Sequence, residues 1–519
     1  MSHLFNADVA EQFPDYLRDE SRRSGRADTI SFAGSDEDVI TVLRSGQPVT
    51  TQGARTGITG GAVPDGGHIL NLSRMTRITG LRAGPGADEF FIRVQPGLPL
   101  SELRAVIRSG NFDTTGWSAE SLAALDVYRQ SAPVFFPPDP TETSASIGGM
   151  VACNASGACT YRYGATRAYV EALRIILMDG AVLSLRRGHE KAEHRAFSVT
   201  TLEGRVLRGV LPDYPMPAVK NASGFYVRDN MDLLDLFVGS EGTLGVFTEI
   251  ELRLIRSPVC RWGVMTFFPS DSAALGFVEA VRNAAPDQRP VAIEYFDSHS
   301  LDLLRRGKAA GETPDGFPEI PSSYYTAVYL EFHGDEDHVM SQIAEVPRQM
   351  TEAGGDDSAT WIADSDRELE RLKIVRHAVP EMVNRVIDER RKQEPGLTKL
   401  GTDMAVPDAE LSAMMDLYRN GLAGAALDYV IFGHIGNNHV HVNILPGSLE
   451  EYDRGKGLYL EWARRVIQLG GTISAEHGVG KFKVALLREM LGGKGIAQMR
   501  EVKRVFDPAG LLNRGTLFG

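Results

Sequence analysis

Three histidines fall within eight residues of one another in the segment 432–446, which reads FGHIGNNHVHVNILP, although the chain of 519 residues has only 12 histidines. The text HVHVNIL alternates between polar and apolar residues, as a strand does when one of its faces lines a site. His439 and His441 then share that face, and His434 lies on the facing arm of a hairpin. We expect His434 and His441 to reach one ion, and paired imidazoles suit a borderline divalent metal such as zinc.

A carboxylate able to complete such a site lies in GGTISAEHGVGKF, residues 470–482. The apolar residues before it recur at i, i+4, i+8 and i+11, which predicts a helix that ends at the paired glycines; they are Leu458, Trp462, Val466 and Leu469. Glu476 and His477 therefore belong to a short strand and turn beyond that helix. Glu476 is the candidate third ligand. The alternative is that the three histidines only pack against polar neighbours in the hairpin.

Glycine is concentrated in three clusters in the first half of the chain, at 52–61, 133–165 and 236–255. Glycine lets backbone N–H groups come close to phosphates, because no side chain blocks the approach. The first cluster, QGARTGITGG, lacks both the GxGxxG spacing of a dinucleotide fold and the Gly-Lys-Ser/Thr ending of a phosphate loop. Alone it could be a surface loop, but three clusters together favour a nucleotide-type cofactor.

Together the clusters resemble the FAD-binding domain of the vanillyl-alcohol oxidase/p-cresol methylhydroxylase (PCMH) superfamily. Within it they look most like the FAD-linked D-2-hydroxyacid dehydrogenases: D-lactate dehydrogenase, the glycolate oxidase FAD subunit and D-2-hydroxyglutarate dehydrogenase. The resemblance continues, in the same order along the chain, through PVAIEYFD, TDMAVP, the histidine hairpin, ISAEHGVGK and FDPAGLLNRGTLF. It implies an α+β fold, with a two-subdomain PCMH-type FAD-binding domain and a ferredoxin-like cap domain built on an antiparallel sheet.

Domain boundaries follow from the same comparison and from the fall in glycine density after Pro258. Beyond that residue, helical text such as 368–389 appears between strand-like runs such as TAVYLEFHG. We expect residues 1–258 to form the FAD-binding domain, with a helical segment at its N-terminus. Residues 259–500 should form the substrate or cap domain with the metal site, and 501–519 a C-terminal segment that returns to the FAD domain.

The resemblance implies FAD contacts from four segments. The pyrophosphate loop corresponds to Gly53, Arg55, Thr56, Gly57, Thr59, Gly60 and Gly61, and the approach to adenosine and isoalloxazine to Pro138, Asp139, Gly148, Gly149, Ser156 and Gly157. The other two segments supply Glu241, Gly242, Gly245, Val246 and Asn513. Met150 stands where the family often has Asn, and Ser156 where it has Gly. The first loop contains no histidine that could tether the flavin, so we expect noncovalent FAD.

The family pattern at the hairpin is Gly-His-Ile-Gly-Asp-Gly-Asn-Leu-His, with its first and last histidines on the metal. These positions correspond to His434 and His441, and Glu476 completes the ligand set for zinc or manganese. His439 stands where the family has Asn, and we assign it a supporting role in which it orients a ligand or a water. His477 becomes the base that takes the hydroxyl proton, while the carbon-bound hydrogen leaves as hydride to the flavin.

The substrate carboxylate needs a cation, and the candidates are Arg55, Arg376 and Lys399. Arg376 lies in text that resembles the family's helix carrying a substrate-facing arginine, with a solvated helix face as the alternative. Gly401 stands where the D-2-hydroxyglutarate branch has lysine. That departure favours D-lactate or another short hydroxy acid over a dicarboxylate.

The predicted function is an FAD- and divalent-metal-dependent dehydrogenase that oxidises a D-2-hydroxy acid, D-lactate by preference, to the 2-oxo acid. Alternatives are a metal-independent flavin enzyme acting on another alcohol or an ether lipid, and a non-catalytic FAD-binding subunit of a glycolate oxidase-type complex. A metallohydrolase is disfavoured because HExxH is absent and a hydrolase has no use for three glycine clusters.

Composition limits the partners and the compartment. The net charge of −13 disfavours nucleic acid, and three cysteines cannot supply a four-thiolate cluster or a disulfide framework. No nicotinamide fingerprint is present, so we expect a quinone, a cytochrome or an electron-transfer flavoprotein as acceptor. No secretory signal and no apolar run of about 18–20 residues is visible. We therefore expect a cytoplasmic protein and leave open a peripheral contact with the inner face of the membrane. A homo-oligomer is expected as well.

Overall fold

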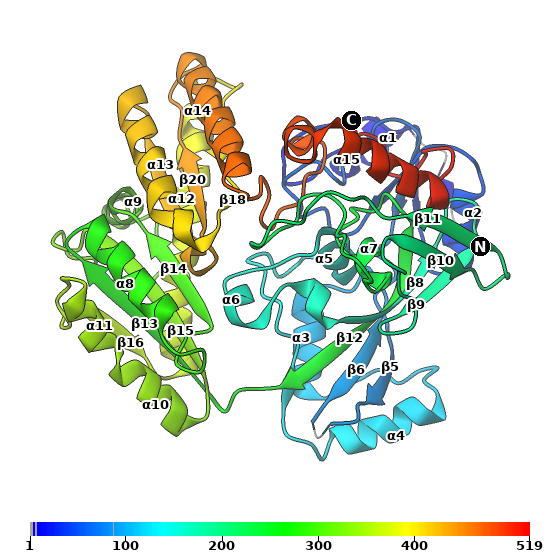
Figure 1. Ribbon diagram of the computed structural model, residues 1–519, viewed down its shortest axis with the longest axis horizontal. Coiled ribbons are helices and arrows are strands. Elements are labelled where there is room, and N and C mark those ends of the chain that lie inside the picture. The colour runs from blue at the N-terminus through cyan, green and yellow to red at the C-terminus, as the bar shows by residue number, and fades with distance from the viewer. Residues whose placement is uncertain (1–3, 6–7, 87) are drawn as a thin grey trace.

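The computed structural model describes residues 4–5, 8–86 and 88–519. Figure 1 shows two lobes side by side: the first contains the N-terminal half of the chain and the red helix α15, and the second contains the green to orange segments. β12 (Val246–Arg256) ends in the first lobe and β13 (Cys260–Phe268) begins in the second. One buried hydrophobic cluster nevertheless continues through both lobes, so they share a core.

The first lobe is built on two main sheets. In the four-stranded sheet, order β1-β2-β4-β3, the last three strands are parallel. The six-stranded antiparallel sheet has the order β5-β6-β12-β8-β9, with β7 also paired to β12, and β10 and β11 form a separate hairpin. The strand bounds are β1 (Leu4–Phe5), β2 (Thr29–Phe32), β3 (Val49–Gln52), β4 (His68–Asn71), β5 (Ile78–Ala83), β6 (Phe90–Val94), β7 (Val134–Phe135), β8 (Val170–Ile176), β9 (Val182–Arg186), β10 (Ala196–Thr200) and β11 (Val206–Val210).

Helices of the first lobe begin at side-chain caps where the sequence supplies them, as Ser35 does for α2 and Ser146 for α5. Their bounds are α1 (Val9–Gln12), α2 (Asp36–Leu43), α3 (Leu100–Ser109), α4 (Ala119–Tyr128), α5 (Ile147–Cys153), α6 (Thr160–Tyr163), α7 (Leu234–Phe237) and α15 (Val484–Phe506). α15 already packs beside β11, so the return to this lobe begins before residue 501. The division at 258 and 500 stays a prediction.

The second lobe is an eight-stranded antiparallel sheet with helices packed on it. Its strand order is β16-β13-β15-β14-β19-β20-β17, and β18 pairs with β20. Its other strands are β14 (Ala292–Phe296), β15 (Thr326–Gly334), β16 (Thr360–Ala363), β17 (Leu400–Gly401), β18 (Met404–Ala405), β19 (Tyr429–Gly433) and β20 (His439–Ile444). Its helices are α8 (Asp271–Asn283), α9 (Ser298–Ala309), α10 (Glu336–Ala344), α11 (Val346–Glu352), α12 (Asp366–Arg391), α13 (Leu411–Ala425) and α14 (Leu449–Gln468). Among the described helices none is long and apolar enough to cross a membrane.

The histidine hairpin forms as predicted. β19 pairs antiparallel with β20, with Phe432 opposite His441, and a short 3-10 turn joins them. Gly433 has a φ of 120°, and a Cβ there would lie 2.8 Å from the imidazole of His441, so only glycine lets the two arms approach this closely. α14 ends at Gln468, as predicted, but begins nine residues before Leu458. The hairpin and the turn after α14 carry the predicted ligands.

A buried histidine in the parallel sheet gives a test of acid stability. The ring nitrogens of His68 lie 2.7 Å from the hydroxyls of Thr29 and Ser31, and burial lowers its pKa to about 4. The unfolded chain binds this proton near pH 6.5, so acid favours unfolding throughout the interval between the two pKa values. Relative to His68→Gln, the wild type should lose roughly 2–3 kcal/mol of unfolding free energy between about pH 7.5 and about pH 4.5. Denaturant titration of both proteins measures this, and parallel pH profiles would refute it.

Candidate active site

A cavity lies where the three glycine clusters meet the turn after α14. Residues from the segments 53–62, 140–156 and 241–247 form its wall, with Gly60 among those that do not face it, and they are joined by Glu476, His477 and Asn513. Most of the predicted cofactor contacts line it: Gly53, Arg55, Thr56, Gly57, Thr59, Gly61, Gly148, Gly149, Ser156, Glu241, Gly242, Gly245, Val246 and Asn513. A Cβ on Gly57 would meet no protein atom within 4 Å. Gly57 is exposed and lines the cavity, so its backbone is open to a bound group or to solvent.

Four predicted contacts do not line this cavity. Gly60 lies against Phe482, and Gly157 packs on the backbone of Asp139. The Asp139 carboxylate accepts the N–H of Cys159, and the Pro138 carbonyl accepts a hydrogen bond from Arg104. The position of a residue in a sequence motif does not show whether it faces the cavity or packs against other protein atoms.

Glu241 joins the third glycine cluster to the turn after α14. Its carboxylate accepts the N–H groups of Val479 and Gly480, each at 2.7 Å, and its carbonyl accepts the side chain of Asn513 at 2.8 Å. Burial raises the pKa of Glu241 to about 7. Gly480 has a φ of 53° and would place a Cβ 2.1 Å from the Thr59 carbonyl, so glycine is required where the turn crosses the first loop.

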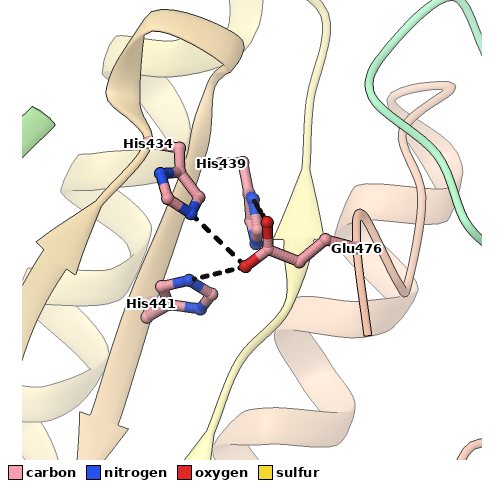
Figure 2. Close-up of side chains that lie close together, drawn as sticks. All are labelled: His434, His439, His441 and Glu476. Carbon is pink, nitrogen blue, oxygen red and sulfur yellow. Dashed lines mark ion pairs between the residues drawn. The ribbon is translucent and has the colours of Figure 1, made fainter. Parts of the chain in front are cut away.

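The predicted metal ligands meet beside this cavity (Figure 2). The Nε2 atoms of His434 and His441 each lie 3.3 Å from Oε1 of Glu476. The other ring nitrogen of His434 lies 2.7 Å from Glu294, and that of His441 lies 3.0 Å from the Thr402 carbonyl. Each imidazole can therefore donate from Nδ1 and keep the Nε2 lone pair for a cation, as metal-binding histidines do.

The electrostatics of this group favour a cation among these side chains. Burial opposes a charge on His434, but the carboxylates of Glu294 and Glu476 outweigh it and raise its pKa to about 9. Burial also opposes ionisation of Glu476, yet Lys220 and His434 hold its pKa well below the usual range. Negative charge that favours a proton on His434 equally favours a divalent ion, so the residues fit the expected metal.

His477 lies between the cavity and the metal-ligand group. It lines the cavity, its side chain is 29% exposed, and its Nε2 lies 3.4 Å from Oε1 of Glu476. Its Nδ1 lies 3.3 Å from Asp403, whose carboxylate also accepts the His477 backbone N–H at 3.1 Å. One carboxylate thus fixes both the backbone and the ring of the predicted base.

Asp403 is buried and organises the whole turn. It accepts the N–H groups of Ala475 and Glu476 and the hydroxyl of Ser474, and it forms an ion pair with Lys483 at 2.6 Å. Burial raises the pKa of Asp403, but His477 and Lys483 more than offset this and hold it well below the usual range. The carboxylate stays charged, so it keeps the turn in place.

His439 is fully buried beside the same carboxylates. Its Nε2 lies 3.0 Å from Oδ1 of Asp403, and its Nδ1 lies 4.0 Å from Oε2 of Glu476. Burial holds its pKa well below the usual value, so the imidazole is neutral. The supporting role predicted for His439 stays a prediction.

The sequence alone assigned no role to three charged residues of the site: Glu294, Asp403 and Lys220. Glu294 and Asp403 lie inside motifs that carry the family resemblance, so their positions were visible but their function was not. Lys220 lies in coil, and its Nζ is 2.6 Å from Oε2 of Glu476 with 3% of the side chain exposed. A single lysine in an irregular segment offers no pattern that would place it here.

The candidate substrate cations differ in position. Arg376 on α12 has only 13% of its side chain exposed and lies 3.6 Å from Glu294 and 4.0 Å from Glu331, which excludes the solvated helix face. Arg55 lines the cavity, with its guanidinium over the ring of Tyr16. Lys399 is largely buried near Arg22, and burial lowers its pKa. The structure therefore brings Arg376 to the Glu294 side of the metal-ligand group and leaves Lys399 near Arg22.

Comparison with protein families matches both lobes. Residues 263–517 match the family profile "FAD linked oxidases, C-terminal domain", and residues 27–121 and 117–186 match "FAD binding domain". The chain belongs to the FAD-linked oxidases. With the antiparallel sheet of the second lobe, these matches confirm the predicted FAD-binding domain followed by a cap domain.

Relatives of this FAD-linked oxidase are named as hydroxyacid dehydrogenases. The probable mitochondrial D-lactate dehydrogenase of Danio rerio is 29% identical over 96% of this chain and 86% of its own. The D-2-hydroxyglutarate dehydrogenase of Xanthomonas citri pv. viticola is 28% identical over 97% and 92%. The mitochondrial D-lactate dehydrogenase [cytochrome] of Arabidopsis thaliana is 26% identical over 94% and 73%. The chain is thus an FAD-linked oxidoreductase of the D-2-hydroxyacid dehydrogenase type.

A solved structure titled alkyldihydroxyacetonephosphate synthase has the same fold. It superposes with a TM-score of 0.60 over 94% of this FAD-linked oxidase and 77% of its own chain, at 15% identity. A likeness at that identity describes the fold alone.

A double-mutant cycle tests whether Asp403 and Lys483 hold the turn together. Removing one member of a buried ion pair leaves the other charge unpaired, so Lys483→Met alone should cost about 3–5 kcal/mol of unfolding free energy. In the Asp403→Asn background its cost should be smaller by about 2 kcal/mol or more. Denaturant unfolding of the four proteins measures the coupling. The exposed pair Arg464 and Glu489 is the control and should show much weaker coupling, and additive costs for Asp403 and Lys483 would contradict the prediction.

Proposed function

We propose that this FAD-linked oxidase oxidises a D-2-hydroxy acid, with D-lactate favoured, to the 2-oxo acid, using noncovalent FAD and a divalent metal held by His434, His441 and Glu476. The observation that supports it best is the position of His477. One imidazole lines the flavin cavity and also lies 3.4 Å from the carboxylate on which two further imidazoles converge. A base in that place can serve a substrate held between a flavin and a metal.

The bound flavin supplies a hydride acceptor, and the bound metal supplies a Lewis acid for the substrate hydroxyl. His477 accepts the hydroxyl proton at Nε2, while Asp403 holds its Nδ1 and prevents the ring from turning away. The carbon-bound hydrogen leaves with its electron pair, and the C–O bond becomes a carbonyl. The two hydrogens of the alcohol thus leave separately, one as a proton to His477 and one as a hydride that the bound flavin would accept.

Arg376 is the proposed partner of the substrate carboxylate. Its contacts with Glu294 and Glu331, at 3.6 Å and 4.0 Å, are longer than hydrogen bonds, and its Nε has no hydrogen-bond partner among the described residues. The guanidinium therefore keeps donor capacity for a carboxylate. Lys399 is the weaker candidate because it lies near Arg22.

The preference for a short substrate rests on Gly401. Glycine presents no cationic side chain for a second carboxylate, and a Cβ there would lie 3.0 Å from the amide oxygen of Asn443. D-lactate has one carboxylate, which Arg376 can bind. The electrons then pass to a quinone, a cytochrome or an electron-transfer flavoprotein.

Anaerobic flavin absorbance tests the reaction. D-lactate should bleach the flavin of the purified protein, whereas L-lactate should not, and D-2-hydroxyglutarate should react more slowly. Removal of the metal with a chelator should abolish bleaching, and a divalent ion should restore it. Bleaching that persists in metal-free protein would favour the metal-independent alternative, and a flavin that no hydroxy acid reduces would refute the function.

Substitution of His477 tests the base. His477→Gln should retain FAD and metal but reduce its flavin about 10²- to 10⁴-fold more slowly, because no side chain then takes the hydroxyl proton. Stopped-flow reduction at saturating D-lactate measures the rate. His194→Gln, at an exposed position of the first lobe, is the control and should react like the wild type. A normal rate in His477→Gln would remove His477 from the base role.

A further inference from the structure

We propose that His439 is a fourth metal ligand, so that this chain holds its ion with three imidazoles and one carboxylate. The inference rests on the metal site of the proposed function and extends it. The resemblance places an asparagine at this position, so the residue would distinguish this chain from the pattern it otherwise follows.

In each of the three imidazoles one ring nitrogen lies near an oxygen of a neighbouring residue, and the other faces Glu476 (Figure 2 shows the Glu476 side). In each ring one nitrogen faces an oxygen acceptor: Glu294 for His434, the Thr402 carbonyl for His441 and Asp403 for His439. In each ring the other nitrogen faces the carboxylate of Glu476. An acceptor on one ring nitrogen fixes the tautomer and leaves the second lone pair for a metal. His439 approaches this condition with its nitrogens exchanged: its Nε2 lies 3.0 Å from Oδ1 of Asp403, without the geometry of a hydrogen bond, and its Nδ1 faces Glu476.

The distances favour ligation over a supporting hydrogen bond. Nδ1 of His439 lies 4.0 Å from Oε2 of Glu476, which is too long for a hydrogen bond, and neither ring nitrogen of this buried imidazole has a hydrogen-bond partner among the described residues. Donor atoms of His434, His439, His441 and Glu476 all lie within 4.8 Å of one another. Donor atoms around a tetrahedral zinc ion are about 3.4 Å apart, since each bond is about 2.1 Å. The 4.0 Å separation would have to close by roughly half an ångström for all four donors to reach one ion.

The neighbouring lysine limits how Glu476 can bind. The Lys220 ammonium lies 2.6 Å from Oε2, so Oε1 is the oxygen left for the metal, and the two shortest histidine contacts also reach Oε1. A carboxylate that binds through one oxygen, with three imidazoles, would give the ion four protein ligands, so a substrate oxygen would bind as a fifth. Three nitrogen donors favour zinc, cobalt or nickel over manganese and magnesium, which prefer oxygen.

Cobalt substitution of the holoenzyme tests the ligand directly. Wild type, His439→Asn and the control His194→Asn are stripped of metal and titrated with Co²⁺ and Zn²⁺ against a competing chelator. His439→Asn should bind both ions more weakly and shift the visible Co²⁺ bands, because one nitrogen donor is lost. Loss of a residue that only orients a ligand also weakens binding, by about 10- to 100-fold, so the band shift decides between the two roles. The control should match the wild type, since His194 is exposed and has a φ of 52° that asparagine readily adopts. Flavin absorbance reports that each protein is folded.

A second variant keeps the inference open to refutation if His439→Asn folds poorly. His439→Cys should add a thiolate-to-cobalt charge-transfer band in the near ultraviolet, which only a residue bonded to the ion can produce. Equal affinity and an unchanged spectrum in His439→Asn, or no such band in His439→Cys, would overturn the fourth ligand and leave the proposed function intact. A wild type that takes up neither ion would instead overturn the metal dependence itself.

Discussion

Two buried carboxylates, one from each lobe, hold the turn 474–480 in place, and the rest of the site depends on this arrangement. Asp403 in the second lobe accepts N–H groups from Ala475 to His477, and Glu241 in the first accepts those of Val479 and Gly480. A backbone N–H left unpaired inside a protein is costly, so the turn is stable only when both carboxylates are present. The position of the base relative to the cavity is thus set by main-chain hydrogen bonding.

Sequence reasoning succeeded where a pattern has one structural solution. Strand alternation placed His439 and His441 on one face, and the hairpin brought His434 to the same side. Helix periodicity placed the end of α14, and therefore the turn that carries Glu476. The meeting of that turn with the hairpin came from the family resemblance, since no local pattern specifies a contact between segments so far apart.

The sequence did not show how deeply a residue is buried or which charged residues from distant parts of the chain lie beside it. Pro138 and Asp139 share a motif with cavity residues, yet they do not line the cavity, because a motif does not say which way a side chain turns. Arg376 could have been a solvated helix residue, and only the packing of α12 shows it to be buried. Lys220 required the whole fold, since its partner Glu476 is more than 250 residues away.

A residue near the C-terminal end of the sequence also lines the cavity. Asn513 lines the cavity, and its side-chain oxygen accepts a hydrogen bond from the backbone N–H of Thr51. Leu512 forms a parallel β-bridge with Val49. A growing polypeptide therefore exposes its first glycine loop on the ribosome long before the residues that close the cavity have been synthesised. Tight incorporation of the cofactor must follow translation of residue 513, and until then the nascent first lobe has to remain soluble without it.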